Sequence, residues 1–183
     1  MKKIIGFSII LFIFSGSVFS QKYMTKNGKI SFYSETKAEK IEAVNNQVSS
    51  ALDIGTGDIV FKLLMKSFLF EKALMQEHFN ENYVESDKFP DATFKGKITN
   101  LSEINFTKNG KYKANVEGDL KIHGLTKKVK SQGNIEIKDG KIIATSKFSL
   151  LLKDYDIKIP NTVINNISES IEITVNVGLD KIK

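Results

Sequence analysis

The residues of this chain that could perform chemistry are few and scattered. Among its 183 residues are two histidines, His78 and His123, and no cysteine. Neither histidine has a second one at the helical spacing of a zinc site, and the carboxylates near His78, at Glu71, Glu77 and Glu81, are spaced like surface charges of a helix. The chain has no Gly-x-Ser-x-Gly nucleophile turn and no glycine-rich phosphate loop. The sequence therefore predicts no catalytic residue, no metal ligand and no cofactor.

A catalytic triad can assemble from residues that are distant in sequence, so a hydrolase or an isomerase stays open as a hypothesis. Such an enzyme would need a cleft in which His78 or His123 meets a carboxylate. We rank this hypothesis last of three, because no motif in the chain supports it, and we expect the protein not to be an enzyme.

The basic residues suggest a solvated surface and no nucleic-acid partner. All 27 of them are lysines, set against 21 acidic residues. Nucleic-acid binding is favoured by arginine forks and by a clustered basic patch, and the sequence shows neither. Most lysines fall on outward positions of the predicted strands. A transient contact with an anionic membrane surface stays open.

The first 20 residues have the pattern of a secretory signal peptide. Lys2 and Lys3 precede an apolar run from Ile4 to Phe14, and Val18 and Ser20 suit a cleavage site before Gln21. We therefore expect a signal peptide at 1–20 and one domain at 21–183, located in the periplasm or secreted. Without a cysteine, the mature chain has no lipoprotein attachment site and no disulfide.

A long hairpin at Lys111–Lys138 organises the mature chain. Apolar and polar residues alternate along both of its arms, which is typical of strands with one buried face. Several inward positions here and in the strands at 92–101 and 141–153 carry unusually small residues. These are Gly96, Ala114, Gly118, Ser131, Gly133, Ala144 and Ser146. Such residues either leave an interior cavity or are compensated by large side chains opposite.

The rest of the chain completes a meander of about eight strands. Asn109-Gly110 and Asp139-Gly140 are strong turn signals on either side of the hairpin, and Asn45-Asn46 suits another tight turn. The segment 71–82 is the only helix predicted, with Phe70, Leu74, Met75, Phe79 and Tyr83 at helical spacing. We expect an all-β, eight-stranded antiparallel barrel with one inserted helix that covers an end of the sheet.

Three segments in their order resemble the YceI-like family of exported bacterial proteins. They are LMQEHFNENYVESDKFPDATFKGKI, GDLKIHGLTKKVK and LLLKDYDIKIP, and the resemblance extends in this order over nearly the whole mature chain. The resemblance implies an extended lipocalin-like barrel with a helix near one end. It also implies binding of a lipid or polyisoprenoid chain in the lumen, and it supplies no catalytic motif.

The first hypothesis is therefore an exported protein that holds an apolar, isoprenoid-like lipid in its barrel. The residues expected to line the lumen, with those of the helix closing one end, are Phe61, Leu63, Met65, Leu74, Met75, Phe79, Phe94, Leu120, Phe148 and Leu150. The second hypothesis is an envelope scaffold with a filled barrel, which would expose an apolar patch near Tyr23–Met24 or Leu151. The sequence indicates neither the ligand's identity nor the oligomeric state.

Overall fold

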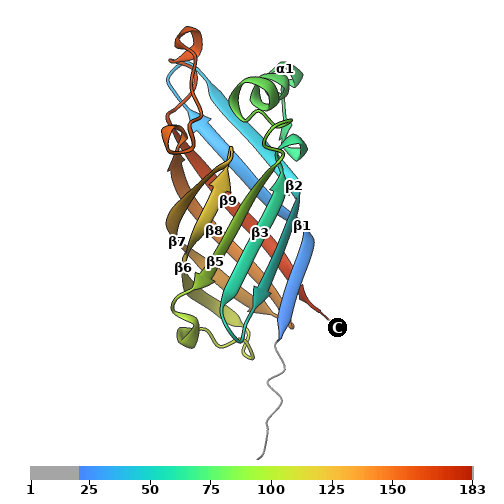
Figure 1. The fold of residues 1–183 in the computed structure, drawn as a ribbon. Coiled ribbons are helices and arrows are strands. Elements are labelled where there is room, and N and C mark those ends of the chain that lie inside the picture. The colour runs from blue at the N-terminus through green and yellow to red at the C-terminus, as the bar shows by residue number, and fades with distance from the viewer. Residues whose placement is uncertain (1–20, 183) are drawn as a thin grey trace, which may run out of the picture.

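Eight strands roll into a closed antiparallel barrel in the computed structural model, which describes residues 21–182 (Figure 1). The order around the barrel is β1-β9-β8-β7-β6-β5-β3-β2, and β2 closes it by pairing with β1. The strands are β1 (Lys22–Glu35), β2 (Lys40–Asp53), β3 (Asp58–Leu64), β5 (Asp91–Ile98), β6 (Gly110–Ile122), β7 (Leu125–Lys138), β8 (Lys141–Leu151) and β9 (Ser170–Lys181). A two-residue strand, β4 (Leu69–Phe70), adds to the edge of β2. The predicted all-β, eight-stranded barrel is confirmed.

The long hairpin forms as its alternation predicts. β6 and β7 pair from Gly110 opposite Ile137 to Ile122 opposite Leu125. Both two-residue turns that bound β7 have a positive φ at each position, 50° and 76° at His123-Gly124 and 51° and 79° at Asp139-Gly140. These left-handed angles match the twist of a hairpin, which is why glycine takes the second position. Asn109-Gly110, in contrast, ends a longer loop that includes the 3₁₀ turn η3 (Leu101–Glu103).

The predicted turn at Asn45-Asn46 is wrong, because β2 runs straight through it. Asn45 is completely buried, its Nδ2 donates to the Leu64 carbonyl at 2.9 Å, and its Oδ1 accepts from the Gln47 amide at 2.9 Å. The register with β1 shifts here, since Gly28 lies opposite Val48 but Ile30 lies opposite Asn45. Asn45 therefore stabilises a β-bulge, and its side chain bonds the bulge to the end of β3.

Two irregular segments cover the same end of the barrel, opposite the C-terminus (Figure 1). The first flap, residues 65–90, joins β3 to β5 and contains the 3₁₀ turn η1 (Met65–Ser67), β4, α1 (Ala73–His78) and the π-helical turn η2 (Phe79–Tyr83). The second flap, residues 152–169, joins β8 to β9 and contains the 3₁₀ turns η4 (Leu152–Tyr155) and η5 (Asn161–Val163). The predicted helix thus forms at the expected place, although α1 starts two residues later. Within residues 21–182, no helix has the length and apolar character needed to cross a bilayer.

The buried side chains form two clusters, one toward each end of the barrel. The cluster away from the flaps includes Leu52, Ile98 and Ile142, and the cluster near the flaps includes Phe68 and Tyr155. Tyr23 belongs to the first cluster and is buried, so it forms no exposed patch with Met24. The space between the two clusters is the candidate site.

Candidate ligand-binding lumen

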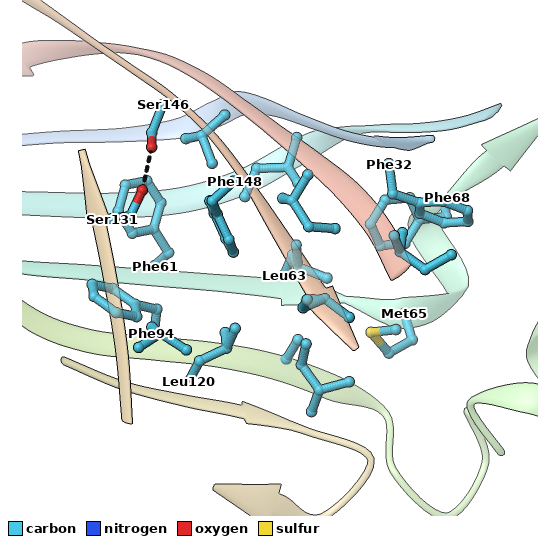
Figure 2. Close-up of a pocket in the computed structure, with 18 of the residues that line it drawn as sticks. Phe32, Phe61, Leu63, Met65, Phe68, Phe94, Leu120, Ser131, Ser146 and Phe148 are labelled. Carbon is cyan, nitrogen blue, oxygen red and sulfur yellow. Dashed lines mark hydrogen bonds between the residues drawn. The ribbon is translucent and has the colours of Figure 1, made fainter. Parts of the chain in front are cut away.

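A cavity of about 350 Å³ lies inside the barrel between the two core clusters. Figure 2 shows Ser131, Ser146 and Phe61 toward one end of it, Phe32 and Phe68 toward the other, and Leu63, Leu120 and Phe148 between them. Nine of the ten residues predicted to line the lumen do line the cavity. They are Phe61, Leu63, Met65, Met75, Phe79, Phe94, Leu120, Phe148 and Leu150.

The tenth residue, Leu74, departs from the prediction. Its side chain is 61% exposed and does not contact the cavity. Met75 and Phe79, four residues apart, define the inner face of the helical segment, and Leu74 is rotated about 100° from Met75. Because α1 lies at the rim of the barrel, a residue off that face meets solvent.

The seven small residues predicted at inward strand positions fall into two groups. Five of the seven line the cavity, namely Ala114, Ser131, Gly133, Ala144 and Ser146. They lie on the neighbouring strands β6, β7 and β8 and pair across them, with Ala114 opposite Gly133 and Gly133 opposite Ser146. This patch of short side chains leaves space that larger residues would fill.

Gly96 and Gly118 do not line the cavity, which corrects the prediction for these two positions. They lie opposite each other on β5 and β6. A Cβ at Gly96 would come within 2.3 Å of the Phe94 ring, and a Cβ at Gly118 would come within 2.4 Å of the Lys95 carbonyl and 2.7 Å of the same ring. The two glycines therefore let the Phe94 ring lie flat on the sheet, so that the ring forms the cavity wall there.

Two hydroxyl groups supply a polar spot in the apolar wall. The Oγ atoms of Ser131 and Ser146 are 2.7 Å apart (Figure 2). Both hydroxyls also face the Gln132 carbonyl, Ser146 at 2.8 Å and Ser131 at 3.3 Å, so one hydroxyl donates to this carbonyl and the other to its serine neighbour. With both hydrogens committed, the pair offers a ligand only acceptor lone pairs. The pair also marks the end of the β7–β8 ladder, whose last matched residues are Gly133 and Ser146.

Four phenylalanines close the cavity on the flap side. Phe79 packs against Phe32, Phe68 and Phe70, with ring centroids 5.4, 5.6 and 5.1 Å apart. Among them, only Phe79 was expected at the lumen. Phe68 falls in an apolar run that the sequence pattern does not assign to strand or helix. Phe70 was expected on the apolar stripe of the helix, whereas it belongs to β4. The aromatic rings thus plug one end and leave the middle of the barrel open.

Two polar side chains connect the two flaps at the end of the barrel that they cover, which we call the mouth of the lumen. Glu39, in the turn between β1 and β2, lies 3.5 Å from Lys72 of the first flap and accepts from the Asn166 amide of the second at 3.1 Å. His123, in the turn between β6 and β7, lies 2.8 Å from a Glu85 carboxylate oxygen. Each of these two side chains therefore joins one strand turn to both flaps, because His123 also bonds to the second flap through its other ring nitrogen.

The second bond of His123 reaches Tyr155, which lies in the segment LLLKDYDIKIP that contributes to the family resemblance. Its Nδ1 lies 2.9 Å from the Tyr155 carbonyl oxygen, and its side chain is only 10% exposed. Tyr155 itself is buried, and this burial, with a smaller contribution from the Asp154 charge, raises the pKa of the phenol to about 12. His123 thus packs between the two flaps and bonds to both.

Few ionisable side chains reach the cavity, among them Glu39, Lys62 and His78. In the part of the chain that the structure describes, no hydrogen bond or ion pair joins His78 to a carboxylate. Among residues 21–182, no group of three histidine or acidic side chains could hold a metal ion. The wall of the lumen is predominantly apolar.

Known proteins share this architecture at low sequence identity. A polyisoprenoid-binding domain from Saccharophagus degradans is 12% identical, with a TM-score of 0.76 over 89% of this chain and 99% of that one. Burkholderia cenocepacia BcnA is 16% identical, with a TM-score of 0.68 over 83% and 95%. The Campylobacter jejuni YceI protein is 17% identical, with a TM-score of 0.54 over 99% and 94%.

At these identities the structural likeness concerns the fold alone. No curated protein matches the chain significantly. The YceI-like domain, in contrast, matches residues 21–179, which is nearly all of the described chain. The protein therefore belongs to the YceI-like family.

Proposed function

We propose that this protein is an exported binding protein that holds one apolar, isoprenoid-like chain in its lumen. The observation that carries the proposal is the cavity of about 350 Å³ with its nearly continuous wall of aliphatic and aromatic side chains. Membership of the YceI-like family and the likeness to a polyisoprenoid-binding domain support a binding protein rather than an enzyme. A filled barrel that acts only as a scaffold would need side chains across this space.

The size of the cavity and its apolar wall account for binding without a polar motif. Ligand sites in proteins span roughly 300–1,000 Å³, so this lumen suits one slender chain. Burial of a methylene group contributes about 0.8 kcal/mol, so ten buried carbons contribute about 8 kcal/mol before the entropic costs of binding. Met65 and Met75, on opposite parts of the first flap, adapt their shape to an irregular hydrocarbon.

The proposed location is the periplasm or the extracellular space, after cleavage of the signal peptide predicted at residues 1–20, which lie outside the described chain. A carrier of a water-insoluble chain must also collect it from a lipid phase, so transient contact with a membrane surface is part of the proposal. The support for export is the amino-terminal sequence pattern.

Two measurements test the binding. Native mass spectrometry of protein purified from its own cells should reveal a bound lipid. Fluorescence titration with a polyene-labelled hydrocarbon chain should then show saturable binding that Ser146→Leu weakens at least tenfold, since the added side chain enters the cavity. Ser149→Leu is the matched control, because Ser149 lies on the same strand with its side chain exposed on the outer face. The proposal fails if no lipid copurifies and the probe does not bind the unmodified protein.

A further inference from the structure

The exposed apolar side chains of this protein are concentrated around the flaps. The four most exposed large ones in the described chain are Leu74 at 61%, Leu69 at 58%, and Leu64 and Ile164 at 50%. Leu69 and Leu74 belong to the first flap, Ile164 follows η5 in the second, and Leu64 ends β3 where the first flap begins. Figure 1 shows both flaps projecting from the same end of the barrel.

The helical segment of the first flap separates the cavity from this surface. Met75 and Phe79 contact the cavity, whereas Leu74, which directly precedes Met75, points to solvent. A helix that only covered a core would present polar residues outward. The exposed leucines thus lie directly outside the closed mouth of the lumen, on the elements that must move for the mouth to open.

The charges of the first flap indicate what kind of surface it could meet. Each of its three lysines is paired with a carboxylate. Lys66 lies 2.6 Å from Asp87, Lys72 lies 3.5 Å from Glu39, and Lys88 lies 3.9 Å from Glu85. No unpaired lysine of this flap is left for an anionic headgroup, so attraction to the surface would depend on the apolar side chains.

We propose that the flap end of the barrel docks on the surface of a lipid bilayer through Leu69, Leu74 and Ile164. The apolar chain then passes between the bilayer and the lumen through the adjacent mouth. This inference rests on the proposed function, because a hydrocarbon cargo has a bilayer as its natural source. The apolar side chains project from two separate flaps, which suits shallow insertion into a fluid interface. A protein partner would require one continuous face of about 800 Å².

The test is flotation with vesicles of pure phosphatidylcholine, which carry no net charge. We expect the full-length mature protein to float with the vesicles, with little change between low and high salt. A triple variant, Leu69→Gln, Leu74→Gln and Ile164→Gln, should show at least a tenfold lower partition coefficient without any change in charge. The matched control is Met24→Gln, Val60→Gln and Ile182→Gln, whose side chains are exposed to 38%, 41% and 43% away from the flaps. The control should float like the unmodified protein.

Three outcomes would overturn the docking. The unmodified protein would stay off the vesicles, or both triple variants would lose flotation equally, or light scattering would show a dimer that only the flap variant dissociates. The last result would assign the surface to a second copy of the chain. Titration with the labelled hydrocarbon in solution, without vesicles, tests the lumen separately from the docking surface. The flap variant should keep its equilibrium affinity for this probe. Normal probe binding without flotation therefore rejects the docking and leaves the proposed binding of an apolar chain in the lumen intact.

Discussion

His123 and Glu85 meet with Nε2 and Oε2 2.8 Å apart, and this contact holds the β6–β7 turn against the first flap. The other ring nitrogen of His123 faces the Tyr155 carbonyl at 2.9 Å. Each ring nitrogen thus faces an oxygen acceptor, and the imidazole N–H donates to at least one of them. The backbone here is held in the left-handed region at both Glu85 and His123, with φ of 44° and 50°. The ring of Phe89 packs edge-on against His123 at 4.6 Å.

Replacement of His123 should therefore loosen both flaps. We expect His123→Ala to lower the free energy of unfolding by about 1–3 kcal/mol, the range for a lost hydrogen bond to a charged group. Urea denaturation would measure this loss, and hydrogen exchange should show faster exchange in both flaps. Lys88→Ala is the control, since its ion pair with Glu85 is exposed and should contribute less than about 1 kcal/mol. Equal losses in the two variants would contradict the assigned role.

Alkaline pH should destabilise the protein through Tyr155. Its pKa is raised to about 12 in the folded state, mainly by burial, against about 10 in an unfolded chain. The resulting stability is complete below pH 10, where both states are protonated, and is lost as pH rises from 10 to 12. The loss amounts to about 3 kcal/mol. Urea denaturation from pH 8 to pH 12 should show that the free energy of unfolding of the unmodified protein falls relative to that of Tyr155→Phe across that window. A constant difference would show that the phenol does not titrate as described.

The glycine pair under Phe94 should tolerate no side chain. We expect Gly118→Ala to lower the free energy of unfolding by about 1–3 kcal/mol, because its Cβ would meet the Lys95 carbonyl at 2.4 Å. Gly178→Ala on β9 is the matched control, since nothing lies within 4 Å of its Cβ position. Calorimetry should show an unchanged or slightly higher melting temperature for that control. Similar melting temperatures for the two variants would contradict the close packing of the ring.

The phenylalanine cluster should account for much of the stability of the flap end. Phe79→Ala removes a ring that contacts three others, and we expect a loss of about 3–5 kcal/mol. Leu74 lies five residues earlier in the chain and is exposed, so Leu74→Ala should change stability by less than about 0.5 kcal/mol. Urea denaturation of the two variants provides the comparison, and a large effect at Leu74 would mean that its side chain is packed.

The alternation of apolar and polar residues was enough to predict the barrel. Side chains in a strand point alternately to its two faces, and only one of these faces is buried. It also located the small-residue patch at Ala114, Ser131 and Ser146, since these positions fall on the inward face of long regular strands. Asn45 was misread because the turn preference of asparagine is a local tendency. In the fold its amide has a partner at Leu64, 19 residues away, and the tertiary contact prevails.

Other features depended on side-chain direction or on distant contacts. The sequence could not show that the space above Gly96 and Gly118 is taken by Phe94, because the ring's direction is not encoded in strand periodicity. The contacts that link the flaps to the strand turns also could not be predicted from the sequence. Glu39 and Asn166 are 127 residues apart, and His123 and Glu85 are 38 residues apart. Such pairs are brought together only when the barrel closes.

The seam between β1 and β9 brings the first and last described strands side by side. Tyr23 lies opposite Lys181, and the amide of Ile182 donates to the Lys22 carbonyl at 2.8 Å. Neighbouring strands are only about 5 Å apart, so a short linker could join these two positions and the chain could be cut at the Asp139-Gly140 turn instead. A circularly permuted protein of this kind should build the same barrel, since the connectivity of its strands would change while every neighbour stayed in place.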